Sequence, residues 1–178
     1  MRSATIFTLI FTFIFMEPMV LFDFNTQCDI SNWKTIDDVV MDGHSNSNFK
    51  LSDNGHGVFS GAVSLENNGG FSSLRYRFPE KIIKGYTKAI LRIKGDRKNY
   101  QFRTKSTAFD RHSYIAKFTT TGKWQTIEIT LDDMYPAFRG YQLDIPNYPA
   151  ETLEEIAFLI GNKKAENFEL VINSIVLE

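Results

Sequence analysis

Arginine and aromatic side chains form the combination in this sequence that is best suited to bind a ligand. Arginine donates paired hydrogen bonds to carboxylates, and aromatic rings stack on sugar rings. Both kinds of residue recur on segments with the alternation of β-strands. The candidate binding residues are Arg75, Arg103, Tyr114, Trp124 and Arg139. We predict that a ligand or partner would contact these residues.

A structural role is the alternative for the same side chains. Arg75 and Arg103 could be buried and matched to carboxylates, because an unpaired buried guanidinium is too costly to keep. We favour this paired arrangement for the two arginines, and for Trp124 we favour a packing role. The carboxylates considered as partners are Asp38, Glu66 and Asp96.

The sequence offers little for catalysis or metal binding. His44, His56 and His112 occur singly, with no cysteine or carboxylate at metal-ligand spacing. Ser60 lies within a strand pattern and not in a G-x-S-x-G nucleophile motif. The pairs Asp37-Asp38 and Asp132-Asp133 could hold calcium or cap a turn, and we expect capping. We therefore predict no catalytic residue, no metal and no cofactor, and keep an enzyme as a minority hypothesis.

Alternation of apolar and polar residues predicts the elements that position these side chains. It is clearest over residues 89 to 94 and 100 to 105, and strands are also expected over 114 to 118, 124 to 131, 157 to 160 and 168 to 177. About eight to ten short strands without a long helical pattern predict an all-β sandwich or jelly roll of antiparallel strands. Helix is expected only as single turns near 131 to 134 and 150 to 155.

The Asn68-Gly69-Gly70 segment predicts a tight turn, because Asn-Gly tolerates the positive φ values that hairpins need. We expect residues 57 to 66 and 71 to 78 to pair as a hairpin, with Gly69 at positive φ. In the second strand Leu74 and Tyr76 share one face, and Arg75 and Arg77 share the other.

Length and charge limit the class of protein. With 178 residues, 43% of them hydrophobic, the chain can form one domain, which we place at residues 21 to 178 and expect to be monomeric. A formal net charge of -1 provides no overall field for nucleic acid. Cys28 is the single cysteine and cannot form an internal disulfide.

Residues 1 to 16 differ from the rest of the chain. Arg2 precedes an apolar run that is too short for an ordinary membrane span and is typical of the hydrophobic region of a signal peptide. Export to a periplasmic or extracellular location is the first hypothesis. A cytoplasmic protein begun at Met16 and a retained N-terminal anchor are the alternatives. The domain itself is expected to contain no integral membrane span.

The chain resembles the complex I intermediate-associated protein family, the thirty-kilodalton assembly factors, in its bacterial members. The matching residues are Trp33, Asp38-Val39-Val40-Met41, Gly43, Ser45, Ser47, Phe59-Ser60-Gly61, Ser64-Leu65-Glu66-Asn67-Asn68-Gly69-Gly70-Phe71, Arg75, Lys94-Gly95-Asp96, Tyr100, Trp124, Pro136, Phe138-Arg139-Gly140 and Phe168-Glu169-Leu170. One departure is Asp42, where the family usually has glycine. The resemblance implies a galactose-binding-like β-sandwich, and in mitochondrial members a role in the assembly of respiratory complex I.

Two functions from different classes remain open. The resemblance implies a non-catalytic, chaperone-like protein-interaction or assembly module. The fold that it implies is also used by carbohydrate-binding modules. The expected partner is accordingly a protein or a carbohydrate, and nucleic acid is not expected.

Overall fold

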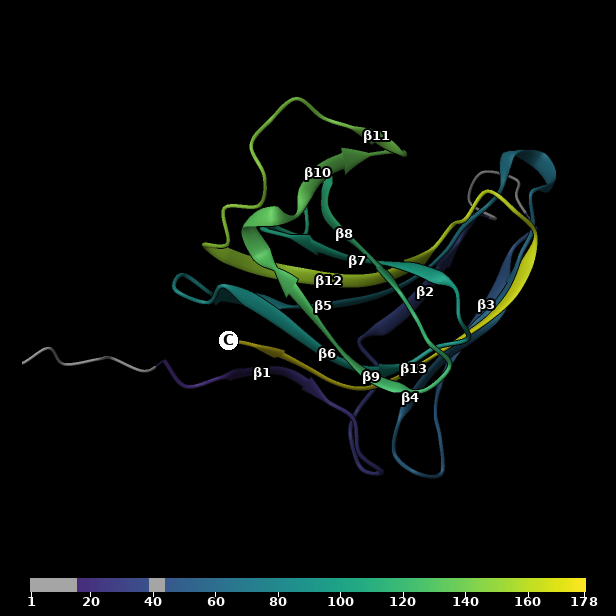
Figure 1. Cartoon of the computed structure of the whole chain (residues 1–178), viewed down its shortest axis with the longest axis horizontal. Helices are drawn as coiled ribbons and strands as arrows, with labels where there is room; N and C mark the ends of the chain where they lie inside the picture. Colours follow the sequence, from purple (N-terminus) through teal and green to yellow (C-terminus); the bar gives the residue numbers. More distant parts are fainter. Residues whose placement is uncertain (1–15, 39–43) are drawn as a thin grey trace, which may run out of the picture.

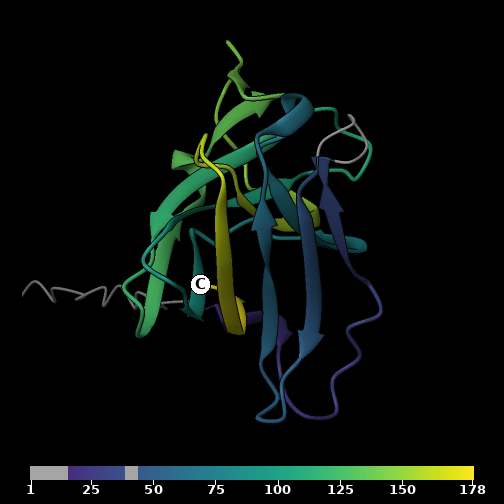
Figure 2. The ribbon, with the colours of Figure 1, turned by 90° about the vertical axis from the view of Figure 1, so that its right-hand side faces the viewer.

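Two antiparallel β-sheets pack face to face in the described part of the protein. The computed structural model describes residues 16–38 and 44–178, which contain thirteen strands and no α-helix. In Figure 1, strands β5, β7 and β12 lie above β1, β6 and β13, and Figure 2 shows the long strands from the side. The predicted antiparallel jelly roll is confirmed, with more strands than the sequence indicated. Residues 1 to 15 and Asp42 lie outside the described residues.

The six-stranded sheet has the order β3-β4-β13-β6-β9, and β1 also pairs with β13. Its long central strand is β13 (Glu166–Leu177), which pairs with β4 along one half and with β6 along the other. The other bounds are β1 (Met19–Asp23), β3 (Asn46–Leu51), β4 (Gly57–Val63), β6 (Lys88–Lys94) and β9 (Trp124–Thr130).

The seven-stranded sheet has the order β11-β10-β8-β7-β12-β5-β2. Strand β12 (Thr152–Ile160) lies between β5 and β7 in the sheet, although it comes much later than both in the sequence. The other bounds are β2 (Trp33–Asp37), β5 (Ser72–Ile82), β7 (Asn99–Lys105), β8 (Ser113–Thr119), β10 (Tyr135–Phe138) and β11 (Tyr141–Gln142).

The core lies between the sheets and follows the predicted alternation. In β6, Ala89, Leu91 and Ile93 have no exposed surface, whereas their neighbours Arg92 and Lys94 are exposed. Strand β12 differs, because every residue from 156 to 160 is buried. A strand with alternate side chains on two faces is buried throughout only when both faces are covered. Its outer side chains are therefore shielded by something other than the opposite sheet.

The predicted hairpin at Asn68-Gly69-Gly70 is wrong. Strand β4 pairs with β3 and β13, and β5 pairs with β2 and β12, so the segment between them crosses from one sheet to the other. It contains a short 3-10 turn, η2 (Glu66–Asn68), with Asn67 at φ 51°. Gly69 has φ -68°, and Gly70 is the residue at positive φ, 133°.

The predicted capping role of Asp37-Asp38 is confirmed at this crossing. Asp38 is fully buried and accepts hydrogen bonds from the backbone N–H groups of Ser45, Gly70 and Phe71 at 3.0, 2.6 and 3.3 Å. Asp37 accepts from the backbone N–H of Ser47 at 2.9 Å. Two carboxylates thus hold the ends of β2, β3 and β5 together.

The two expected helical turns have different outcomes. Leu131–Asp133 forms the 3-10 turn η3, as predicted. The helical turn predicted near residues 150 to 155 is wrong, because β12 begins at Thr152 and pairs there with β5. Within residues 16–38 and 44–178, no helix has the length and apolar character needed to cross a membrane.

Candidate functional site

The outer face of the seven-stranded sheet carries two of the predicted binding residues, Arg75 and Arg103. Side chains alternate between the two faces of a strand. The residues of β7 that are buried in the sandwich are Tyr100, Phe102 and Thr104. Arg103 must therefore point outward, as does Arg75, which follows the buried Leu74 of β5.

Arg75 and Arg103 belong to one row of side chains that runs across the sheet. Ala157 of β12 lies opposite Arg75 on one side and Arg103 on the other. Residues directly opposite one another in antiparallel strands share a face. Strands are about 4.8 Å apart, so the two arginines start about 10 Å from each other, with the short Ala157 side chain between them. The full row is Lys34, Arg75, Ala157, Arg103, Ile115 and Tyr135.

A groove of about 630 Å³ lies beside this row, over β7, β8, β10 and the end of β12. Its apolar floor includes Ile115, Ala137 and Leu159, which are only 3, 6 and 7% exposed. Leu159, on the outer side of β12, is part of this floor. The polar and charged residues that line the groove are Asn99, Gln101, Arg103, Lys117, Thr119, Tyr135, Asn162 and Lys163. None of the described lining residues is acidic.

Arg103 is held in the groove by an uncharged partner. Its Nε and Nη2 atoms both donate to Oε1 of Gln101, at 2.9 and 2.7 Å. In residues 16–38 and 44–178, no carboxylate lies within ion-pair distance of the Arg103 guanidinium. Burial, with a smaller contribution from the charge of Arg75, lowers the pKa of Arg103 to about 10. The guanidinium is thus still charged at neutral pH, and it is partly desolvated without a counter-ion.

The carboxylate of Glu155, next to this row on β12, is already paired. Arg77 Nε lies 2.6 Å from Glu155 Oε2, and the Glu155 side chain is only 3% exposed. Lys105 is opposite Glu155 on β7 and donates from Nζ to the backbone carbonyl of Asp110 at 2.6 Å. Burial lowers the pKa of Lys105, and the charge of Glu155 opposes that effect. The acidic group of this face is therefore engaged away from Arg103.

Tyr135 is the aromatic ring of the groove lining nearest to the arginine row, and a cation covers it. Lys117 Nζ lies 5.8 Å from the centre of the Tyr135 ring. Tyr100 and Phe118, which also line the groove, belong to the core and are 1 and 8% exposed. The groove therefore offers mainly polar and cationic surface above an almost buried apolar floor, and Tyr135 is more exposed than the other two aromatic residues.

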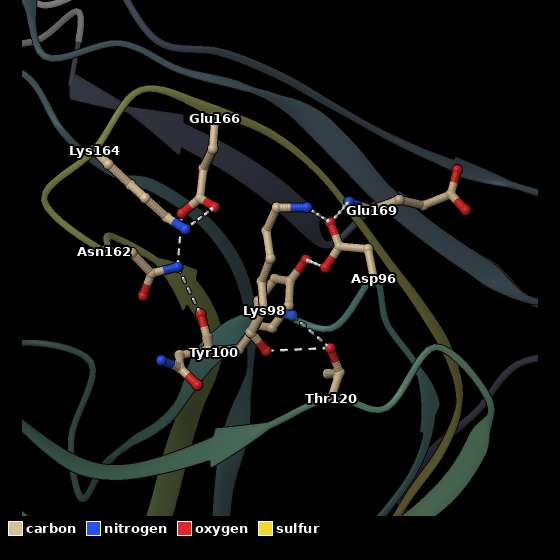
Figure 3. Close-up of polar contacts among 9 residues, drawn as sticks. Asp96, Lys98, Tyr100, Thr120, Asn162, Lys164, Glu166 and Glu169 are labelled. Atoms are coloured by element: carbon tan, nitrogen blue, oxygen red, sulfur yellow. Dashed lines mark hydrogen bonds and ion pairs between the residues drawn. The ribbon is translucent and has the colours of Figure 1, made fainter.

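A network at one end of the groove positions Asn162. Its Nδ2 donates to the backbone carbonyl of Asn99 at 3.1 Å and to Oε1 of Glu166 at 2.7 Å. Glu166 also pairs with Lys164, with 3.2 Å between Oε2 and Nζ. Figure 3 shows these side chains together at the loop between β12 and β13. The groove wall formed by Asn99 and Asn162 is thus fixed by the connection between the two sheets.

Asp96 completes the same end of the groove (Figure 3). It accepts from Lys98 Nζ at 2.6 Å, from the Tyr100 hydroxyl at 2.9 Å and from the backbone N–H of Glu169 at 3.0 Å. Burial, and then the charge of Asp96, raise the pKa of Tyr100 well above its usual range. Tyr100 is therefore a neutral structural donor.

The other three predicted residues are not assembled around Arg103. Tyr114 points into the core, 9% exposed, with its ring 4.9 Å from that of Tyr148. Trp124 begins β9 in the other sheet. Arg139 lies in the turn between β10 and β11, with its guanidinium 5.4 Å from the Phe138 ring. The structure brings together Arg75 and Arg103, and leaves Arg139 at the rim, next to Gly140 of the lining.

The favoured pairing of Arg75 and Arg103 with carboxylates is wrong for the described residues. Asp96 pairs with Lys98, Glu66 with His44, and Asp38 with backbone N–H groups. Sequence reasoning missed Gln101, Lys117, Tyr135 and Asn162 as groove residues. The outward position of Gln101 could have been read from the alternation in β7. The contribution of Tyr135 and Asn162 could not, because it depends on how distant segments pair.

The two-sheet sandwich defines a class of fold, the jelly rolls, and several solved jelly-roll structures are similar to it. The family 11 carbohydrate-binding module of a cellulosomal cellulase of Clostridium thermocellum is similar, with a TM-score of 0.70, 16% identity, and 92% of this chain and 95% of that chain covered. A family 11 module from Clostridium thermocellum in complex with a β-1,3-1,4-mixed-linked tetrasaccharide has a TM-score of 0.66, 18% identity, and 90 and 94% coverage. An exo-β-agarase matches with a TM-score of 0.56, 12% identity, and 90% of this chain but 24% of its own.

The sequence defines the family more narrowly. Residues 22–172 match the model of Complex I intermediate-associated protein 30, and the chain belongs to this family. No curated protein sequence matches the chain significantly. The resemblance noted in the sequence is confirmed.

Proposed function

We propose that the chain is a non-catalytic protein-interaction module of the assembly-factor kind, and that it binds a partner protein in the groove on the seven-stranded sheet. Membership of the Complex I intermediate-associated protein 30 family supports this function. The structural observation that carries it is the guanidinium of Arg103, which is partly desolvated and, among the described residues, donates to Gln101 and to no carboxylate. Such a group gains most from a partner that brings an acceptor.

The histidines support a non-catalytic role. His44 pairs with Glu66, the His56 ring lies against Trp124, and the His112 ring lies against Tyr114. None of the three lines the groove. A general base must lie within hydrogen-bond reach of the group from which it takes a proton, and the described groove lining offers no such arrangement.

Carbohydrate binding is the second candidate function. It is favoured by the similarity of the fold to the family 11 module whose complex contains a tetrasaccharide. The groove supplies amides of the kind that bond to sugar hydroxyls, from Asn99, Gln101 and Asn162. The position of Lys117 Nζ over the Tyr135 ring, 5.8 Å from its centre, counts against it, because a sugar ring would compete with this cation for the aromatic face.

Photo-crosslinking in cells of the native host tests the proposal. A photoreactive amino acid replaces Thr119, an exposed residue of the groove lining, and in the control it replaces Lys50, which is exposed on β3 of the other sheet. We expect one protein, identified by mass spectrometry, to crosslink to position 119 and not to position 50. Equal yields at the two positions, or no protein product at 119, would overturn the protein-interaction function.

Calorimetric titration with a mixed-linked glucan tetrasaccharide tests the second candidate. Under the proposed function, we expect no saturable binding. Saturable binding that is lost in Gln101→Ala, and kept in the control Asn48→Ala on the exposed face of β3, would establish the carbohydrate function in its place.

A further inference from the structure

The charges on the outer face of the seven-stranded sheet indicate which ligand chemistry the groove would accept. Resting on the function proposed above, we propose that the groove binds an acidic segment of the partner protein, with a carboxylate held by Arg103 beside Arg75. The occupant is a peptide with glutamate or aspartate and an aliphatic neighbour.

The first support is the arrangement around Ala157. Arg75 and Arg103 lie on its two sides in one row, and its side chain ends at Cβ. Ala157 itself is only 3% exposed and does not line the groove, whereas Arg103 does, so a ligand in the groove meets Arg103 with the charge of Arg75 close to it. A carboxylate can accept hydrogen bonds from several donors through its two oxygens, so it matches this arrangement.

The second support is the balance of charge. Lys117 and Lys163 add positive charge to the groove, and its described lining contains no acidic residue. The carboxylates near the groove are already paired, Glu155 with Arg77 at 2.6 Å, Glu166 with Lys164 at 3.2 Å and Asp96 with Lys98 at 2.6 Å. The whole chain has a net charge of -1, so the positive groove is a local feature and not a result of overall composition. Like charges brought close without a counter-ion repel, and an anionic ligand removes that repulsion.

The third support distinguishes a peptide from an acidic sugar. The apolar floor of the groove includes Ile115, Ala137 and Leu159, which are 3, 6 and 7% exposed and present a shallow aliphatic patch. Aliphatic surface accepts the side chains of leucine or isoleucine, whereas sugar rings prefer an exposed aromatic face. Lys117 covers the Tyr135 ring. A peptide that combines carboxylates with an aliphatic residue therefore fits both features of the groove.

Fluorescence anisotropy with the full chain tests this inference. The probes are a labelled short peptide of glutamate and leucine, the same peptide with glutamine in place of glutamate, and a labelled oligogalacturonate. We expect the glutamate peptide to bind roughly tenfold or more tightly than the glutamine peptide, and to weaken as salt is added. We expect the oligogalacturonate to bind no better than the glutamine peptide.

Two groove variants and one control locate the binding. Arg103→Gln and Lys117→Gln should each weaken binding of the glutamate peptide, Arg103→Gln by about tenfold or more. Arg92→Gln removes the same charge from the exposed face of β6 in the other sheet and should leave the affinity unchanged. Lys117 is exposed, so that variant keeps the test valid if Arg103→Gln does not fold.

Three results would overturn the inference. They are equal binding of the glutamate and glutamine peptides, tighter binding of the oligogalacturonate than of the glutamate peptide, and equal losses in Lys117→Gln and Arg92→Gln. If any of these occurs while the crosslink at position 119 persists, the protein-interaction function stands and only the acidic ligand is rejected. Loss of the crosslink rejects the proposed function itself.

Discussion

The carboxylate of Asp38 accepts a hydrogen bond from the backbone N–H of Gly70, with 2.6 Å between Oδ2 and N. The bond ties the end of β2 to the segment that crosses between the sheets. Asp38 has no exposed surface, and it also serves the N–H groups of Ser45 and Phe71. Several backbone donors at the crossing thus depend on one side chain.

Replacing Asp38 with alanine should destabilise the fold strongly. The change leaves buried N–H groups without acceptors, and each such group costs about 1 to 3 kcal/mol. We expect a loss of about 3 kcal/mol in the free energy of unfolding, measured by urea denaturation. Asp53→Ala, in an exposed turn, is the control and should change stability by less than about 0.5 kcal/mol. Equal midpoints for the two variants would show that the crossing does not need this carboxylate.

Asp38 should also make stability depend on pH. Burial alone would raise the pKa of Asp38, but hydrogen bonds from Ser45, Gly70 and Phe71 outweigh it and lower the pKa. The folded protein therefore binds the proton less tightly than the unfolded chain, whose pKa is about 3.9. The contribution of Asp38 is complete above about pH 4 and decreases as the pH falls through the lower folded pKa. Between pH 5 and pH 2, the unfolding free energy of wild type should fall more than that of Asp38→Asn. Parallel profiles would contradict the lowered pKa.

Gly69 and Gly140 should respond to alanine for different reasons. At Gly69 a Cβ would lie 2.6 Å from Oδ2 of Asp38, which is fixed by its hydrogen bonds, so we expect a loss of about 2 kcal/mol. At Gly140 nothing lies within 4 Å, and only the φ of 84° is unfavourable, so about 1 kcal/mol is expected. Thermal unfolding measures both.

A double mutant separates these two causes. In the Asp38→Ala background, the cost of Gly69→Ala should fall, because the colliding carboxylate is gone. The cost of Gly140→Ala should be unchanged in the same background. Additive effects for Gly69 would show that its side-chain space is not limited by Asp38.

Particular residues show how far the sequence alone could reach. The outward direction of Arg75 follows from the alternation in β5, and the inward direction of Leu91 from that in β6, because both depend only on local periodicity. The turn chemistry of Asn68-Gly69-Gly70 correctly predicted that one strand ends before this segment and another begins after it. It did not reveal that β4 and β5 enter different sheets, since that depends on pairing with β13 and β12, about a hundred residues away. The groove on the seven-stranded sheet was not predicted for the same reason, because its lining comes from strands that are distant from one another in the sequence.

Arg77 and Arg103 lie on the same sheet face but should differ in their effect on stability. Arg77 neutralises Glu155, a side chain that is 3% exposed, so Arg77→Ala leaves a buried carboxylate without its partner. We expect a loss of about 2 kcal/mol, less than for a fully buried pair because the Arg77 side chain is 57% exposed. Arg103→Ala leaves behind only the neutral amide of Gln101, so we expect a change of less than about 1 kcal/mol. Thermal melts of the two variants beside wild type measure the difference. A melting temperature for Arg103→Ala as low as that of Arg77→Ala would mean that Arg103 supports the fold, and would remove the main reason to place a ligand beside it.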